Sequence, residues 1–154
     1  MLRTYAKITA FVCLLAIPTL VAAHCQVPCG IYADQRRFEA MLEDQKTIAK
    51  AINQMAMLSE KKDPQSFNQA VRWVVTKDEH ASNTQKIIAE YFMSQRLKPD
   101  DKKYVMKLTA AHGVMRAAMV CKQKASPKAA AALKMAIFKF YEAYEGKKPT
   151  FHDH

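Results

Sequence analysis

Apolar residues downstream of position 34 recur at intervals of three and four, which is the period of an amphipathic helix. A first helix is expected from Asp34, which stands at a capping position, to about Leu58. The positions expected to face the core are Phe38, Met41, Leu42, Ile48, Ile52, Met55 and Leu58. The segment 61–64 is charged and ends in proline, so it predicts a break after this helix.

The same period continues from Gln65 to Arg96 and predicts a second helix. Its expected buried stripe consists of Phe67, Val71, Val74, Ala81, Ile88, Tyr91 and Phe92. Residues 77–83 in its middle are mostly polar, and they are the expected site of a bend.

Two shorter helices complete the pattern. The third starts in the segment Lys98–Asp101 and reaches about Lys124, with Tyr104, Leu108, Ala111, Met115, Ala118 and Met119 facing inward. The fourth runs from Ser126, followed by Pro127 in the first turn, to about Glu145, and Gly146 suits the position just after its end. Four amphipathic helices with short connections predict an all-α fold, an antiparallel four-helix bundle over residues 34–146.

Residues 1–23 follow a different pattern. Arg3 and Lys7 give a positive start, residues 8–20 are mostly apolar, and Val21-Ala22-Ala23 offers small residues. This order is typical of a cleaved secretory signal peptide. The apolar run is shorter than the roughly 20 residues of a membrane-spanning helix, and Pro18 interrupts it. We therefore expect an exported protein, periplasmic or secreted, with no membrane anchor after cleavage and a mature domain of residues 24–154. The alternative is a cytoplasmic protein whose leader is a pro-segment.

The amino-acid composition agrees with a helical fold and limits the classes of binding partner to be expected. Half of the 154 residues are apolar and only three are glycine, which favours one helix-rich domain. The formal net charge is +10, but the bases are scattered and no nucleic-acid-binding signature accompanies them. We expect no nucleic-acid partner. Solvated helix faces explain most of the charge, and attraction of a small anion is the alternative.

Cleavage after Ala23 would give the chain unusual chemistry at its new terminus. His24 would then offer a free α-amine and an imidazole, and Cys25 would offer a thiolate and a backbone nitrogen that a strongly binding metal can deprotonate. Cys29 adds a second thiolate. Together the amine, the amidate and the two thiolates form a square-planar N₂S₂ set, with the imidazole available as an axial ligand.

A square-planar site of this kind selects nickel(II) or copper(II) over zinc, which prefers a tetrahedron. Two thiolates tend to reduce copper(II), so nickel is the better match, and anionic donors stabilise its higher oxidation state. The spacing of the cysteines alone is a weak signal, and a Cys25–Cys29 disulfide in an exported protein is the competing interpretation.

The segment His24-Cys-Gln-Val-Pro-Cys-Gly-Ile-Tyr32 resembles the metal hook of the nickel superoxide dismutases at each of its fixed positions, which are His24, Cys25, Pro28, Cys29, Gly30 and Tyr32. The resemblance implies a four-helix bundle that carries one nickel ion per subunit, disproportionates superoxide and assembles as a homohexamer. It also implies that His24, Cys25 and Cys29 bind the metal and that Tyr32 lies over its open face.

The resemblance further suggests three residues outside the hook. Glu39 falls at the position of the glutamate that orients the histidine ring, if one residue is deleted after Tyr32. Tyr91, within Glu90-Tyr91-Phe92, matches a motif whose tyrosine lies near the metal. The arginine that partners the glutamate has no clean counterpart, and Lys77 and Arg72 are the nearest cations.

Two other functions compete with the enzyme. The same chelate could belong to a non-catalytic exported carrier or sensor of nickel or copper, which turnover of superoxide would exclude. A helical interaction bundle closed by a Cys25–Cys29 disulfide would contain no metal. The remaining candidates are interpreted as structural: Cys121 as a core thiol, and His80 and His112 as surface histidines or histidines paired within the fold.

Overall fold

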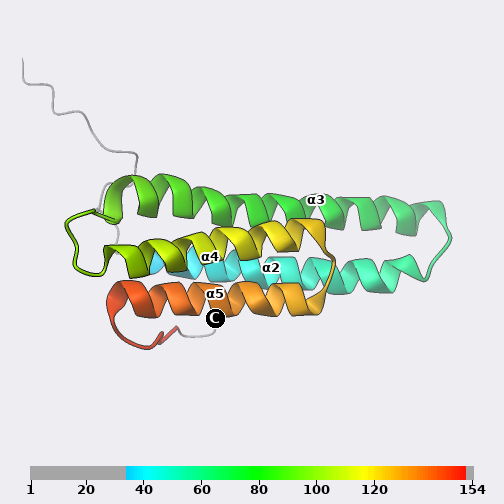
Figure 1. Ribbon diagram of the computed structural model, residues 1–154. Coiled ribbons are helices and arrows are strands. Elements are labelled where there is room, and N and C mark those ends of the chain that lie inside the picture. The colour runs from blue at the N-terminus through cyan, green and yellow to red at the C-terminus, as the bar shows by residue number, and fades with distance from the viewer. Residues whose placement is uncertain (1–33, 152–154) are drawn as a thin grey trace, which may run out of the picture.

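The computed structural model describes residues 34–151. Their helices are α2 (Gln35–Ser59), α3 (Pro64–Lys86), the π-helix η1 (Ile87–Arg96), α4 (Tyr104–Gln123) and α5 (Pro127–Glu145). Because η1 continues α3 directly, these described residues form four helical rods, and each rod runs antiparallel to the next (Figure 1). Residues 34–151 contain no strand. The predicted all-α antiparallel bundle is therefore confirmed, whereas the leader (1–23) and the hook (24–32) lie outside the described residues.

The helix ends follow the local sequence signals in part. Asp63 caps α3 by accepting a hydrogen bond of 2.9 Å from the Ser66 backbone N–H, and Pro64 occupies the first turn. Gly146 ends α5 with φ of 74°, a left-handed conformation that glycine adopts at low cost. Ser126 stands before Pro127 as expected, but its side chain makes no capping hydrogen bond.

The core is densest in aromatic residues at the end of the bundle where α2 begins. There Phe38 packs against Phe92, Phe140 and Tyr141, with ring centroids about 5 Å apart. Aromatic pairs with this spacing and these tilted or edge-on orientations add to the free energy gained by burial. Since the three partners come from η1 and α5, this cluster locks the first turns of α2 to two other rods.

The α2–α3 pair extends beyond α4 and α5 at the opposite end of the molecule (Figure 1). Because no other helix covers it there, part of the predicted buried stripe is exposed. Phe67 is 71% exposed, Val71 46% and Val74 38%, so their assignment to the core of this chain was wrong. Met119 on α4 was also wrongly assigned to the core, since it is 41% exposed. The residues of the second stripe that are buried as predicted are Ala81, Ile88, Tyr91 and Phe92.

The second rod is irregular at a different place from the one expected. Residues 77–83 remain α-helical. Lys77 donates to a carbonyl oxygen of α4, and His80 and Asn83 contact Asp44 of α2. Ser82 donates to the Asp78 carbonyl oxygen of its own helix without breaking it. The departure comes at η1, where the Leu97 N–H donates to the Phe92 carbonyl oxygen at 2.9 Å, five residues back. Such π-helical turns occur frequently at functional sites.

Candidate functional site

Asp34, the first described residue, is the hub of a polar cluster at the start of α2. Its carboxylate accepts hydrogen bonds from Arg96 Nε at 2.9 Å and Arg96 Nη2 at 2.8 Å, from Tyr144 Oη at 2.7 Å, and from the Tyr91 hydroxyl. Hydrogen bonds to a charged group contribute about 1.5–3 kcal/mol each. This one side chain therefore joins α2 to η1 and α5.

The cluster fixes the protonation states of its members. Burial alone would raise the pKa of Asp34, but the hydrogen bonds from Arg96, Tyr91 and Tyr144 outweigh it and lower that pKa. The pKa values of Tyr91 and Tyr144 are both raised, first by burial and then by the adjacent carboxylate. Asp34 is thus a carboxylate near neutral pH, and both tyrosines are neutral hydrogen-bond donors.

The π-helical backbone explains how Tyr91 and Arg96 reach the same carboxylate. Two residues five positions apart point about 140° away from each other in an α-helix. In a π-helix the backbone bond closes over five residues, so these positions come nearly into line. The side chains of Ser94 and Gln95 also bond to carbonyl oxygens five residues back, those of Ala89 and Glu90.

A second arginine borders this cluster. The Arg37 guanidinium lies 5.4 Å from the centroid of the Tyr91 ring, and the Arg96 guanidinium lies 5.6 Å from it. Within residues 34–151, the buried Nε of Arg37 has no hydrogen-bond partner. The Tyr91 ring is buried at 5% exposure. Tyr91 is therefore a buried phenol with cations near its ring and its hydroxyl directed to Asp34.

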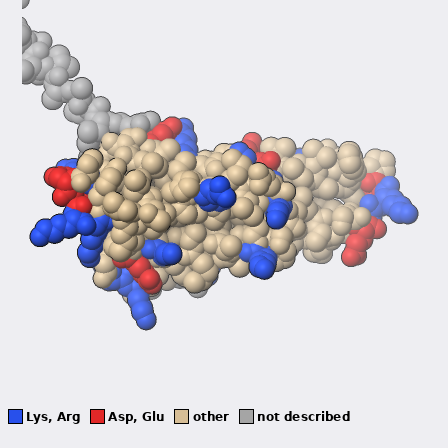
Figure 2. Space-filling view, in the orientation of Figure 1, with Lys and Arg blue, Asp and Glu red and all other residues tan. Residues whose placement is uncertain are grey.

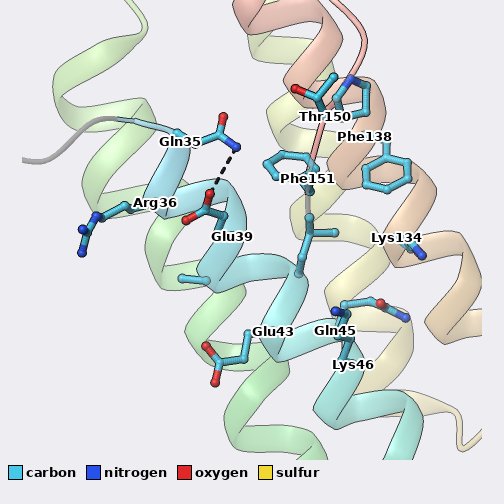
Figure 3. A pocket seen from close by; sticks show the side chains of 13 residues that line it. Gln35, Arg36, Glu39, Glu43, Gln45, Lys46, Lys134, Phe138, Thr150 and Phe151 are labelled. Carbon is cyan, nitrogen blue, oxygen red and sulfur yellow. Dashed lines mark hydrogen bonds between the residues drawn. The ribbon is translucent and has the colours of Figure 1, made fainter. Parts of the chain in front are cut away.

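Glu39 lies one turn into α2 and lines a groove of about 700 Å³ between α2, α5 and the C-terminal segment (Figure 3). Its carboxylate accepts a hydrogen bond of 3.3 Å from Gln35 Nε2. Lys134 and Phe138 of α5 and Phe151 form the facing wall. Glu39 is exposed, so its carboxylate remains accessible from the groove.

The two cations considered as partners of Glu39 lie elsewhere on the chain. Lys77 is buried at 3% exposure, and its Nζ donates to the carbonyl oxygens of Cys121 at 2.7 Å and Lys122 at 2.9 Å. Arg72 is exposed on α3. In the described residues, Arg96 is the cation that binds Asp34 at the start of α2. The sequence analysis did not identify Arg96, Asp34 or Tyr144 as candidate site residues. The spacing of apolar residues does not reveal a π-helical segment, so it could not predict that Arg96 would reach Asp34.

The remaining candidates have partners within the bundle. The His80 Nδ1 is 2.7 Å from the buried carboxylate of Asp44, which also accepts hydrogen bonds from Asn83 and Thr84. Burial raises the pKa of Asp44 despite these contacts. Cys121 is fully buried, and burial raises the pKa of its thiol to about 11. His112 is exposed on α4. The structural interpretation of Cys121 is confirmed, and that of His80 is refined to a hydrogen-bond partner of Asp44.

The described part of the chain offers no alternative metal centre. Residues 34–151 contain no group of three or more His, Cys, Asp or Glu side chains arranged to hold an ion. The candidate ligands His24, Cys25 and Cys29, and also Tyr32, lie outside this range. None of the helices in it is both long enough and apolar enough to cross a membrane.

Comparison with known proteins places the chain in a family. A family model described as nickel-containing superoxide dismutase matches residues 19–148, which include the hook and every helix of the described bundle. No curated protein and no solved structure gave a significant match. The family match covers well over half of the chain and agrees with the observed all-α bundle. The chain therefore belongs to the nickel-containing superoxide dismutases, enzymes that use a nickel cofactor to convert two superoxide anions into O₂ and H₂O₂.

Proposed function

We propose that the nickel ion of this superoxide dismutase is bound by the segment that begins at His24 once residues 1–23 have been removed. The observation that carries the proposal is the distribution of donors. Residues 34–151 bring no metal-binding group together, while His24, Cys25 and Cys29 stand within six consecutive residues inside the family match.

The chemistry of these donors fits nickel. The His24 amine, the Cys25 amide nitrogen and the two thiolates provide four donors of the kind that favours square-planar nickel(II). The His24 imidazole would offer a fifth donor to the bound ion. Bound there, nickel supplies a one-electron couple between Ni(III) and Ni(II) that superoxide can both reduce and reoxidise.

Three residues are proposed to support the reaction around this centre. Tyr32 covers the open face and orients the incoming anion, and Glu39 accepts a hydrogen bond from the histidine ring. The exposed position of Glu39 in the groove near the start of α2 supports that role. Tyr91 stays protonated because its pKa is raised, so it does not act as a base. Its hydroxyl donates to Asp34, two residues after the hook, and through that contact it would support the site.

Superoxide is an anion, and the chain that starts at His24 carries a formal net charge of +8, because removal of residues 1–23 takes away Arg3 and Lys7 and no acid. Lys and Arg side chains project from the end of the bundle where α2 begins, as well as from the opposite tip (Figure 2). The basic residues at the first end include Lys98, Lys102, Lys103, Lys147 and Lys148. Positive charge near the attachment of the hook raises the rate of encounter with a small anion, and salt screens this effect.

We further propose that the chain works as a homo-oligomer, a hexamer by its family resemblance. An apolar ridge formed by Phe67, Val71, Val74 and Val75 supports self-association, because it is exposed along the uncovered part of α3. These positions follow the helical period and would be buried by a second copy of the chain. The leader predicts export to the periplasm or to the medium.

The test is N-terminal sequencing and elemental analysis of protein purified from its natural host, together with an assay of superoxide turnover. The proposal expects a chain that starts at His24, contains one nickel per subunit and is active. A chain with another terminus or without nickel would overturn the proposed site. Bound nickel or copper that exchanges without turnover would instead indicate a carrier.

A further inference from the structure

Asp34 links the proposed metal-binding segment to the bundle. It follows Tyr32 by two residues and Cys29 by five, and α2 starts at the next residue. An aspartate at this position normally accepts a hydrogen bond from the first backbone N–H groups of its helix. The Asp34 side chain makes no such bond and is turned toward the other helices. The Asp34 carboxylate therefore does not cap its own helix and instead bonds to residues of other helices.

The tertiary contacts surround the carboxylate with donors from two other rods. Arg96 binds it through two nitrogens, and Tyr144 reaches it from α5. Tyr91 completes the set from η1. Because Arg96 holds both carboxylate oxygens in a forked geometry, the direction of the carboxylate is fixed as well as its position.

The irregular backbone of η1 serves this same arrangement. The π-helical segment aligns Tyr91 and Arg96, which would diverge in a regular α-helix. This alignment brings both side chains to Asp34, and it also places the Arg96 guanidinium 5.6 Å from the centroid of the Tyr91 ring. The π-helical backbone of η1 and the Asp34 side chain that does not cap α2 therefore act together. They fix the position of Asp34, where the segment that precedes α2 leaves the bundle.

We propose that Asp34 is a positioning residue of the nickel site, which fixes the point where the metal-binding segment leaves the bundle; this rests on the function proposed above. Five residues of extended chain reach at most about 18 Å. Holding Asp34 therefore confines Cys29 to the neighbourhood of this end of the bundle. A released Asp34 would let the first turn of α2 fray and would widen the range of positions open to the ligands.

The test compares three variants of the protein that starts at His24. Asp34→Asn keeps the shape of the side chain but removes its charge, and Tyr144→Phe removes one donor while retaining the ring. Asp44→Asn is the matched control, because Asp44 is a carboxylate of α2 that, like Asp34, is contacted by three side chains from elsewhere in the bundle. The nickel dissociation constant is measured by competition with a chelator, and the absorption spectrum of the nickel–thiolate centre is recorded.

Loss of a residue that supports metal ligands typically weakens metal binding by about 10–100-fold. We expect Asp34→Asn to weaken nickel binding within this range and to alter the spectrum, with a smaller effect for Tyr144→Phe. Asp44→Asn should leave the dissociation constant within about threefold of that of the unmodified protein, a margin small beside the 10–100-fold range.

Two results would overturn the inference: unchanged nickel binding in Asp34→Asn and Tyr144→Phe, or equal weakening in Asp44→Asn, which would attribute the effect to general stability. If Asp34→Asn fails to fold, the comparison of Tyr144→Phe with Asp44→Asn decides. Failure of the proposed nickel site has a different signature, since Cys29→Ser would then bind nickel as well as the unmodified protein does.

Discussion

The Lys77 ammonium lies 2.7 Å from the carbonyl oxygen of Cys121, so a buried cation from α3 completes the C-terminal end of α4. It also donates to the Lys122 carbonyl oxygen and to Asp78. The last carbonyl groups of a helix lack partners within that helix, and they carry partial negative charge. Lys77 therefore stabilises the junction of α3 and α4, at a distance from the start of α2.

Replacing Lys77 by methionine should lower the free energy of unfolding by about 2–3 kcal/mol, because buried carbonyl groups lose a charged donor. Urea denaturation measures the change. Lys124→Met is the control, since Lys124 is exposed in the adjacent loop and should change stability by less than about 0.5 kcal/mol. Equal stability of the two variants would contradict this role, and nickel binding should be retained in both.

The Asp34 cluster predicts a specific dependence of stability on pH. Because the pKa of Asp34 is lowered in the folded state, its ionisation stabilises the fold above the unfolded-state value of about 3.9. This contribution is lost as pH falls through the lowered value. The difference in unfolding free energy between the unmodified protein and Asp34→Asn should therefore be constant from pH 5 to 7 and shrink below about pH 4. A difference that grows in acid would refute this.

The cluster also predicts sensitivity to alkali. The pKa of Tyr144 is raised by burial and by Asp34, so the fold favours its neutral form. Stability should fall as pH rises above the unfolded-state value of about 10. In Tyr144→Phe this fall should be smaller, which thermal unfolding between pH 8 and 11 would detect. Tyr91, whose pKa is also raised, should account for the part of the fall that remains in Tyr144→Phe.

The apolar ridge on α3 predicts an effect on assembly. Phe67→Asp should weaken self-association by at least about tenfold, because burying a large apolar side chain contributes about 1.5–3 kcal/mol. Sedimentation over a range of concentrations would show it. Met135→Asp is the control, since Met135 is 64% exposed on α5 and lies away from the ridge. A Phe67 variant that assembles as strongly as the Met135 variant would exclude the ridge as a contact.

Thiol reactivity separates the structural cysteine from the proposed ligands. Cys121 is buried and its thiol pKa is raised to about 11, so it should not react at pH 8 in the native protein. In reduced, metal-free protein starting at His24, Cys25 and Cys29 should react rapidly. The third thiol should appear only after denaturation. Rapid reaction of all three would contradict the burial of Cys121.

The chelate depends on the position of the α-amine. Adding one residue before His24 moves that amine away from the Cys25 nitrogen, so nickel binding and superoxide turnover should both be lost. The helical circular dichroism of the bundle should be unchanged. Activity that survives the addition would exclude the terminal amine as a ligand.

The helices were predictable from the sequence because their signals are local. The predicted bounds of the first and fourth helices, Asp34 to Leu58 and Ser126 to Glu145, lie within one residue of α2 and α5. Phe38, Ile48 and Ile52 are buried as expected, since the period of apolar residues defines one face of a helix. The period cannot say what covers that face. Phe67 and Val71 were therefore assigned to a core that their own chain does not supply.

The sequence by itself determined the number of helices, the sides they bury and the donors grouped at His24, Cys25 and Cys29, because these depend on short-range order along the chain. Only the tertiary structure decided where the polar side chains find partners. Asp34 and Tyr144 meet across 110 positions, and Lys77 and Cys121 across 44, in a packing that no local pattern encodes. A buried charge without a partner costs free energy, so each buried charged side chain must find a partner among the residues that the fold places next to it. The role of such a residue therefore depends on the packing of the helices.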